Sequence, residues 1–232
     1  MNDQKNILTQ FNLGSLVLAR SNLYAFVSII YSDPTSVKFQ SINDQSFQEL
    51  LKENLREHGM TDYVSDEPLE ELAEKIFLFV RKNKTQIQDE YVTIFGHTLS
   101  KQTAPYELEH LKNEDVFFRT QCLADLSGFY KAFGLEIDKK ERADHISVQA
   151  EFLSNVFVKE WVAREQNLGH EKIEVCQKAQ LDFWNDHFYE WTKIFTLNMI
   201  TQTRGCFYPM ASQFVKAFLT FEKSVYNTYK KQ

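Results

Sequence analysis

Residues 143–166 read ADHISVQAEFLSNVFVKEWVAREQ, and this stretch has the residue spacing of a long helix. Its apolar side chains recur every three or four residues, which is the period of one face of an α-helix. They are Ile146, Ala150, Leu153, Phe157 and Trp161. Gly169 follows the stretch, and glycine is favoured just beyond a helix end because it adopts the left-handed conformation easily. The stretch therefore predicts an amphipathic helix that ends before Gly169.

The same spacing continues along the chain in both directions. Asn113 is predicted to cap a helix that ends at Gly134. In residues 35–42, apolar and polar side chains alternate weakly. We expect that short segment to be a strand, a helical turn or an irregular segment. Helices are predicted over residues 7–31, 47–58, 68–84, 85–95, 113–133, 143–166, 170–199 and 210–229.

The scarcity of turn-forming residues supports the same fold class. Only 7 Gly and 4 Pro occur in 232 residues, whereas a sheet-rich domain needs many of them for its turns. No repeat and no linker rich in Pro, Gly and Ser interrupts the chain. The sequence therefore predicts an all-α, single-domain helical bundle of about seven to nine helices over residues 1–232.

Charge and cysteine content exclude several classes of partner and site. Lys and Arg number 26 against 32 Asp and Glu, so the net charge of −6 has the wrong sign for general nucleic-acid binding. The cysteines, Cys122, Cys176 and Cys206, show no close pairing and predict neither a disulfide framework nor a zinc site. We expect no nucleic-acid partner, and a reducing compartment.

The apolar stretches and the N-terminal residues bear on location. Residues 1–6 lack the basic segment and apolar core of a secretory signal. The longest continuous apolar stretch, residues 24–31, is much shorter than the ~20 residues that a membrane span needs. We expect a cytoplasmic protein that does not insert into a membrane.

Most enzyme motifs are missing from the sequence. It has no glycine-rich phosphate loop, no dinucleotide fingerprint and no G-x-S-x-G turn, so nucleotide binding is not predicted. Glu107 and His110 form one Glu-x-x-His pair, but a carboxylate-bridged metal site in a helical bundle needs two. A helical metal-dependent oxidoreductase using these two residues is the alternative function. We expect instead a surface position for His110, and neither a metal nor another cofactor.

The segment Glu141-Arg142-Ala143-Asp144-His145 marks the start of the helix predicted over residues 143–166. In a first helical turn, an Asp side chain accepts hydrogen bonds from free backbone N–H groups, and an adjacent His can reach a neighbouring loop. From spacing alone, Asp144 is interpreted as a capping acid and His145 as a surface residue.

This segment also resembles a family signature. Glu141-x-x-Asp144-His145, with Glu151-Phe152-Leu153 after it, is similar to the E-P-x-D-H signature of the TorD/DmsD/NarJ family of redox-enzyme maturation chaperones. Further segments that agree with this family in order are Glu90–Gly96 (E-Y-x-x-L-F-x-G), Ala104–Glu107 (the Pro-Tyr loop) and Asp186–Trp191 (the H-L-x-x-W helix).

One position departs from the family pattern, because Arg142 stands where the signature has Pro. Proline in a first helical turn mainly preorganises the start of the helix. The change is therefore expected to loosen this loop more than to abolish a binding role.

The resemblance implies a cytoplasmic chaperone without catalytic activity, dedicated to a molybdenum enzyme of the DMSO reductase type. Such proteins bind the apo-catalytic subunit, often through its twin-arginine signal peptide, until the molybdopterin cofactor is inserted. A peptide with a basic head and an apolar body needs carboxylates beside an apolar groove. The residues that we expect to face the peptide are Glu141, Asp144, His145, Tyr91, Tyr106 and Trp191.

Other interpretations stay open at this stage. Tyr91 and Trp191 also have the helical spacing of core residues. A helical adaptor without a client of this kind is a third hypothesis. The chain could also form a homodimer, since helical bundles with long connectors can exchange elements between copies.

Overall fold

The chain is almost entirely helical in a computed structural model, which describes residues 13–57, 67–96, 103–111, 115–138 and 141–229. Within these ranges, nine α-helices have 12 residues or more. They are α2 (Leu13–Ile30), α4 (Gln45–Glu57), α5 (Leu69–Lys82), α6 (Lys84–Phe95), α7 (Val116–Ala132), α8 (Ile146–Glu165), α9 (His170–Phe183), α10 (Tyr189–Gln202) and α11 (Phe207–Tyr229). The same ranges contain no strand, so the predicted all-α bundle is confirmed.

Shorter helical segments connect some of these helices. They are α3 (Val37–Gln40), the 3-10 turns Ser41–Asn43 and Glu107–Glu109, and the π-helical turn Trp184–Phe188. Residues 37–43 are therefore helical, so that of the three structures expected for residues 35–42 the helical turn is confirmed and the strand is wrong. The predicted single helix over residues 170–199 is also wrong, because the π-helical turn separates α9 from α10.

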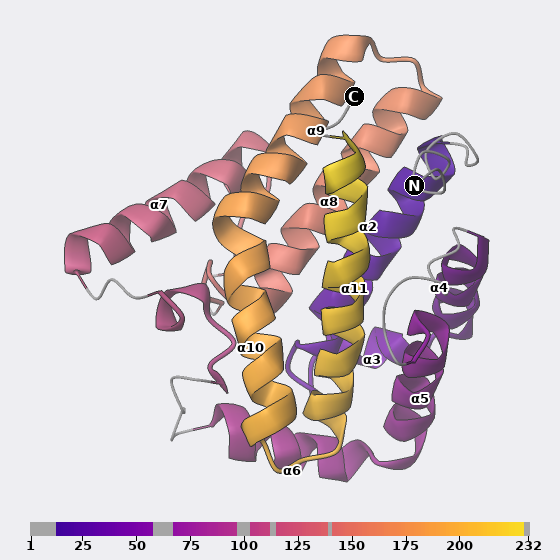
Figure 1. The fold of residues 1–232 in the computed structure, drawn as a ribbon, viewed down its shortest axis with the longest axis vertical. Coiled ribbons are helices and arrows are strands. Elements are labelled where there is room, and N and C mark those ends of the chain that lie inside the picture. The colour runs from indigo at the N-terminus through magenta and orange to yellow at the C-terminus, as the bar shows by residue number, and fades with distance from the viewer. Residues whose placement is uncertain (1–12, 58–66, 97–102, 112–114, 139–140, 230–232) are drawn as a thin grey trace.

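Helices α2 and α8 lie against each other and share the most extensive helix–helix contact of the described structure. Tyr24 of α2 stacks on Phe157 of α8 with ring centroids 5.4 Å apart. Helices α10 and α11 pack antiparallel beside them, α7 extends from one side of the bundle, and α4 and α5 lie on the other (Figure 1). Because α7 is covered on only part of its surface, two of its residues alone, Leu126 and Tyr130, are buried.

A buried ion pair joins α2 to α11. Nη2 of Arg20 lies 2.7 Å from Oε2 of Glu222, and the two side chains are exposed by 2% and 0%. The guanidinium also lies over the ring of Phe157, at 4.3 Å from the centroid. Since a buried charge without its partner is strongly unfavourable, this pair fixes the position of α11 against α2.

Several helix ends agree with the sequence prediction. Gly134 and Gly169 follow α7 and α8 and have φ values of 70° and 99°, the left-handed region that favours glycine. The N-cap of α7 is Asp115, whose Oδ1 accepts a hydrogen bond from the N–H of Phe118 at 3.0 Å. Asn113, the predicted cap, lies outside the described residues.

Helix α2 has the length and composition of a membrane-crossing helix, with 18 residues and a mean hydropathy of 1.5. The sequence prediction that no segment is long enough to cross a membrane considered only continuous apolar residues, and for α2 this prediction is wrong. However, 72% of the helix is buried inside the structure, where it packs against α8. Its apolar surface is therefore used in the core.

Candidate functional site

Two of the segments that carry the family resemblance lie side by side. Tyr106 and His145 form an isolated antiparallel β-bridge. On either side of it, the N–H of Glu107 donates to the carbonyl oxygen of Asp144, and the N–H of Ile146 donates to that of Pro105, both at 2.9 Å. These main-chain bonds hold the Pro-Tyr loop against the start of α8.

In the structure, Asp144 and His145 have roles that differ from the predicted ones. His145 is the N-cap of α8, and its Nδ1 accepts a hydrogen bond from the N–H of Ser147 at 3.1 Å. Asp144 is fully buried, and its Oδ2 accepts from the N–H of Leu108 at 3.2 Å. Asp144 therefore holds the 3-10 turn that starts at Glu107 instead of capping α8, and the interpretation as a capping acid for that helix is wrong.

Arg142 is the direct partner of Asp144. Its Nε and Nη2 donate to the two carboxylate oxygens of Asp144 at 3.0 and 2.8 Å. Its guanidinium also lies over the ring of Tyr106, 4.0 Å from the centroid. Burial lowers the pKa of Arg142, but the hydrogen bonds and charge of Asp144 outweigh this and raise it above its usual value. Arg142, which stands where the signature has Pro, therefore joins Asp144 to Tyr106, and the expected loosening of the loop stays a prediction.

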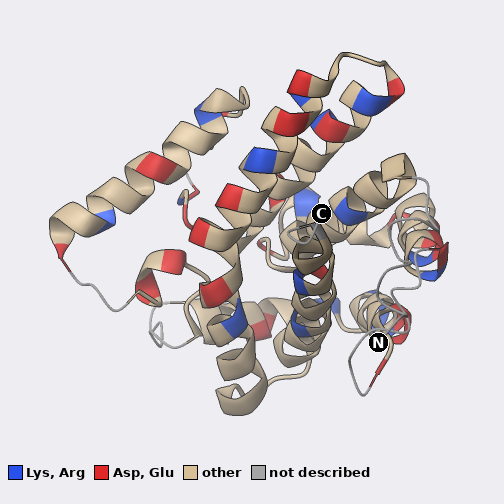
Figure 2. Cartoon of the chain, turned by 45° about the horizontal axis from the view of Figure 1, so that its top comes forward, with Lys and Arg blue, Asp and Glu red and all other residues tan. Residues whose placement is uncertain are grey.

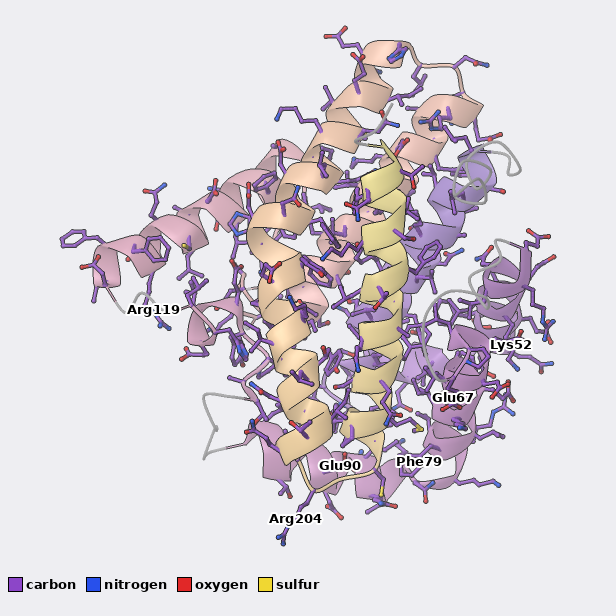
Figure 3. The ribbon with its side chains drawn as sticks, viewed as in Figure 1. Lys52, Glu67, Phe79, Glu90, Arg119 and Arg204 are labelled. Atoms are coloured by element: carbon purple, nitrogen blue, oxygen red, sulfur yellow. The ribbon has the colours of Figure 1, made fainter. Side chains whose placement is uncertain are left out.

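The turn is also tied to the first part of α7. Arg119, on the α7 arm of the molecule (Figure 3), donates from Nη2 to Oε1 of Glu109 at 2.9 Å and from Nη1 to the carbonyl oxygen of Leu108 at 3.0 Å. Nη2 of Arg142 lies 3.7 Å from the same Oε1 of Glu109. Glu109 thus links the turn to two arginines.

His145 is half-buried and uncharged near neutral pH. Burial, followed by the positive charges of Lys38 and Arg142, lowers the pKa of His145 to about 3. An uncharged ring is consistent with Nδ1 acting as an acceptor from Ser147. The ring centroid lies 5.2 Å from that of Tyr106, so these two predicted site residues are in contact.

Beneath this surface lies a chain of polar side chains, all of them buried except Asp125, which is 59% exposed. Oε1 of Glu107 lies 3.2 Å from Nδ1 of His187, and its Oε2 accepts from Nε2 of Gln149 at 2.6 Å. Nε2 of His187 lies 3.1 Å from Oδ2 of Asp125 on α7. Oε1 of Gln149 in turn accepts from Nε1 of Trp191 at 3.0 Å. The chain connects the Pro-Tyr loop with α7, α8 and the π-helical turn.

The two titratable members at the centre of this chain influence each other. Burial raises the pKa of Glu107, against the opposing effect of His187 and Gln149. Burial lowers the pKa of His187, but the hydrogen bonds and charges of Glu107 and Asp125 outweigh this and raise it above its usual value. The two carboxylates beside His187 therefore favour its charged form, against the effect of burial on its pKa.

Trp191 belongs to this interior and not to the outer surface. It is 4% exposed, and its Nε1 also donates to the carbonyl oxygen of His187 at 2.7 Å. His110 stacks on it with ring centroids 5.5 Å apart, and Nε2 of His110 lies 2.8 Å from the carbonyl oxygen of Ala104. The half-buried His110 is thus not the free surface residue that was expected.

The alternative metal site depends on Glu107 and His110 acting together, and the structure gives them different partners. Glu107 bonds His187 and Gln149, whereas His110 bonds the main chain and stacks on an indole ring. In the parts of the chain that the structure describes, no three His, Cys, Asp or Glu side chains are arranged to hold a metal ion.

Tyr91 lies on α6, half-buried between Phe95 and Tyr208, with ring centroids 5.3 and 6.2 Å away. Burial, and then the charges of Asp33, Tyr106 and Glu141, raise the pKa of Tyr91 to about 12. The hydroxyl of Tyr91 is therefore within electrostatic range of two other predicted site residues. Of the six predicted residues, Tyr106 and His145 are in contact, Glu141 is exposed, Tyr91 is half-buried on α6, and Asp144 and Trp191 are buried.

Glu90, the residue before Tyr91, has a different task. Its carboxylate accepts hydrogen bonds from the backbone N–H groups of Cys206, Phe207 and Tyr208, at 3.0, 3.1 and 2.8 Å. Figure 3 shows Glu90 at the lower end of the bundle, beside the connection between α10 and α11. Glu90 therefore caps α11 from a distant part of the sequence, a role that no local pattern indicates.

A cavity of about 310 Å³ opens at the start of α8, and we call it the acidic cavity. The buried side chains of Tyr130, Val148 and Phe152 form an apolar floor. Its charged lining residues are Lys38, Glu136, Asp138, Glu141 and Glu151. The predicted site residue Glu141 is exposed and forms part of its rim.

A helical bundle that presents aromatic rings and carboxylates around a partly apolar cavity has the features of a protein-binding module. Comparison with protein families agrees with this class. The chain matches the nitrate reductase delta subunit family over residues 62–197, more than half of its length, and belongs to that family. Its members are molybdoenzyme assembly chaperones and act with the catalytic subunit of a molybdoenzyme. No curated protein matches the chain significantly.

The family match covers the whole region from Glu90 to Trp191 in which the sequence resembled the TorD/DmsD/NarJ chaperones, so that resemblance is confirmed. The carboxylates of Glu107 and Asp125 lie within hydrogen-bond distance of the two ring nitrogens of His187, which stands between them. These contacts hold the loop that carries Tyr106.

Proposed function

We propose that this protein is a chaperone for a DMSO-reductase-type molybdoenzyme, which binds the apo-catalytic subunit and assists insertion of the molybdopterin cofactor. We further propose that it recognises the twin-arginine signal peptide of that subunit, and that residues 1–232 act as one domain in the cytoplasm. The observation that carries the proposal is the surface of Tyr91, Tyr106 and His145 beside the acidic cavity, in a chain of this family.

The surface suits both parts of such a peptide. Carboxylates such as Glu141 attract a basic head, and the exposed edges of Tyr106 and the uncharged His145 suit an apolar segment. Lys and Arg positions alternate with Asp and Glu positions along the visible helices (Figure 2), so that basic residues do not gather on one face in this view. Attraction of the peptide therefore depends on local carboxylates near the surface.

Asp144 and Trp191 take part in this proposal as positioning residues. Asp144 is bonded to Arg142 on both oxygens and is not free to meet an incoming arginine. Trp191 holds Gln149 and, through it, Glu107. Changes at either residue would act by moving the Pro-Tyr loop, not by removing a contact with the peptide.

Calorimetric titration of a synthetic peptide with two adjacent arginines and an apolar segment tests the peptide site. The Tyr106→Leu/Glu141→Gln variant should bind at least about fivefold more weakly than the wild type, which corresponds to about 1 kcal/mol. Glu190→Gln is the matched control, because it removes an equally exposed acid on α10 away from the site. Equal affinity of all three proteins would remove this surface from the proposal.

Copurification tests the client. The full chain, tagged and produced in its own host, should retain a catalytic subunit of a molybdopterin enzyme that lacks its cofactor. Retention of only the cofactor-loaded subunit would contradict a role before insertion. The proposal includes no cofactor of the chaperone itself, and sedimentation of the purified chain tests the predicted homodimer.

A further inference from the structure

We infer that Lys38 occupies the place of the client's basic group in the acidic cavity, and that the peptide displaces it on binding. The inference rests on the function proposed above and adds an internal competitor to the site. Its starting point is that a cationic side chain of this chain already lies among the carboxylates of the cavity.

The contacts of Lys38 are those of a bound cation. Its Nζ lies 2.5 Å from Oε2 of Glu151 and 3.5 Å from Oγ of Ser147. Both partners belong to the first turns of α8, which His145 caps. The ammonium therefore lies between the acidic cavity and the predicted peptide surface, and its charge acts on His145.

The ion pair is weak enough to be exchanged. The side chains of Lys38 and Glu151 are exposed by 27% and 50%, and partly exposed pairs of this kind contribute little to stability. A guanidinium presents five N–H donors in a fixed plane and can bond both oxygens of a carboxylate, which an ammonium cannot do. An incoming arginine is thus a better ligand for Glu151 than Lys38 is.

Displacement needs only a movement of the lysine side chain. Lys38 lies on the short helix α3, which is anchored by Phe39, 2% exposed and 5.8 Å from the ring of Phe207. Val37, on its other side, is 89% exposed and makes no anchor. The backbone of α3 can therefore stay in place while the flexible side chain of Lys38 rotates into solvent.

The remaining charges of the region fit an acid-lined site with a competitor. Glu136, Asp138 and Glu141 line the cavity together with Glu151 and Lys38. Arg142 is bonded to Asp144 and so is not available to Glu151. Residues 139–140, both lysines, lie outside the described residues, and the experiment below keeps them constant.

A double-mutant cycle separates local competition from a general effect of charge. The four proteins are the wild type, Lys38→Met, Glu151→Gln and the double variant. The probe is the synthetic peptide with two adjacent arginines and an apolar segment, titrated calorimetrically at about 0.15 M salt. Lys131→Met is the matched control, because Lys131 is exposed and follows the cavity residue Tyr130 without lining the cavity.

Competition predicts a specific pattern. Lys38→Met should bind the peptide about 3- to 10-fold more tightly than the wild type, whereas Lys131→Met should stay within about twofold. Glu151→Gln should change affinity little in the wild type, where Lys38 already neutralises the acid. In the Lys38→Met protein the same change should abolish the gain. A peptide with two glutamines in place of the arginines should not benefit from Lys38→Met.

Two outcomes overturn the inference in distinguishable ways. If the wild type binds the peptide but the effects of the two substitutions add, or Lys131→Met gains as much as Lys38→Met, then Lys38 does not compete and the proposed function stands. If neither the wild type nor Lys38→Met binds the arginine peptide, the proposed peptide recognition fails, and the inference with it. Circular dichroism establishes that all variants are folded.

Discussion

The cap that Glu90 provides for α11 gives the sharpest prediction about stability. The first N–H groups of a helix have no partner within the helix, and here three of them donate to a carboxylate that is 8% exposed. Glu90→Ala removes both acceptor oxygens and with them all three hydrogen bonds. Loss of a side-chain cap costs about 0.5–2 kcal/mol, and hydrogen bonds to a charged group are worth about 1.5–3 kcal/mol. Because Cys206 is exposed and water can reach its N–H, we expect a loss of about 2–4 kcal/mol.

Gly205 provides an independent check on the same geometry. A Cβ added at this position would lie 2.6 Å from Cδ of Glu90, and the carboxylate cannot easily move because three hydrogen bonds hold it. Gly205→Ala should therefore lower the free energy of unfolding by about 1–3 kcal/mol in the wild type. In the Glu90→Ala protein the carboxylate that the added Cβ would meet is gone. Gly205→Ala should there be neutral or slightly stabilising, because it restricts the unfolded chain.

Urea unfolding followed by circular dichroism measures both effects, provided that the slope of the transition stays constant. Glu171→Ala serves as the control, since Glu171 is an exposed acid in the first turn of α9 and should cost at most about 1 kcal/mol. The reasoning is refuted if Glu90→Ala costs no more than this control. It is equally refuted if Gly205→Ala costs the same in both backgrounds.

Three further predictions concern other polar groups and use the same unfolding measurement. Arg142→Ala should lower the free energy of unfolding by about 1–3 kcal/mol, because it leaves Asp144 buried without its cation. The additional change Asp144→Asn should recover much of this loss. An Arg142→Ala protein of wild-type stability would contradict the pairing. His187 has a folded-state pKa above its usual value, so its contribution to stability is complete below the unfolded-state pKa of about 6.5 and is lost as pH rises through the folded-state pKa. The stability advantage over His187→Gln should therefore shrink as pH rises above about 6.5, and an advantage that grows would contradict the raised pKa. Arg20→Met should lower the free energy of unfolding by about 3–5 kcal/mol, because it leaves Glu222 buried without its partner, and Arg20→Met/Glu222→Met should lower it much less. A double variant as unstable as Arg20→Met would show that the buried ion pair is not the reason for the loss.

Regular spacing explains why most of the helices could be predicted from the sequence. A helix such as α8 shows its apolar face through local periodicity, and Gly134 and Gly169 mark ends that only the local backbone decides. The π-helical turn at Trp184–Phe188 escaped prediction for the same reason. One additional residue in one turn hardly alters an apolar pattern that extends over two consecutive helices.

The motifs placed Tyr106 near His145, and the structure brings these two rings into contact. That they face a peptide together with Glu141 stays a prediction, and the local pattern did not give the role of each residue. Whether Asp144 caps its own helix or a distant turn depends on which N–H group lies nearest, and here that is the N–H of Leu108. Such contacts depend on tertiary packing, and the spacing of residues around position 144 contains no information about that packing.

The positions of the family motifs suggest why the sequence identifies the family more easily than the client. Glu90 caps α11, Asp144 holds the turn at Glu107, and His187 joins that turn to α7. Each of these side chains is buried and bonds a different part of the same fold, so the fold depends on them whatever the client is. Part of the lining of the acidic cavity, such as Lys38 and Glu136, lies outside these motifs and is partly exposed, so it can differ at little cost to the fold. Selectivity for a client should therefore follow substitutions around the acidic cavity, whereas substitutions in the motifs should appear first as losses of stability.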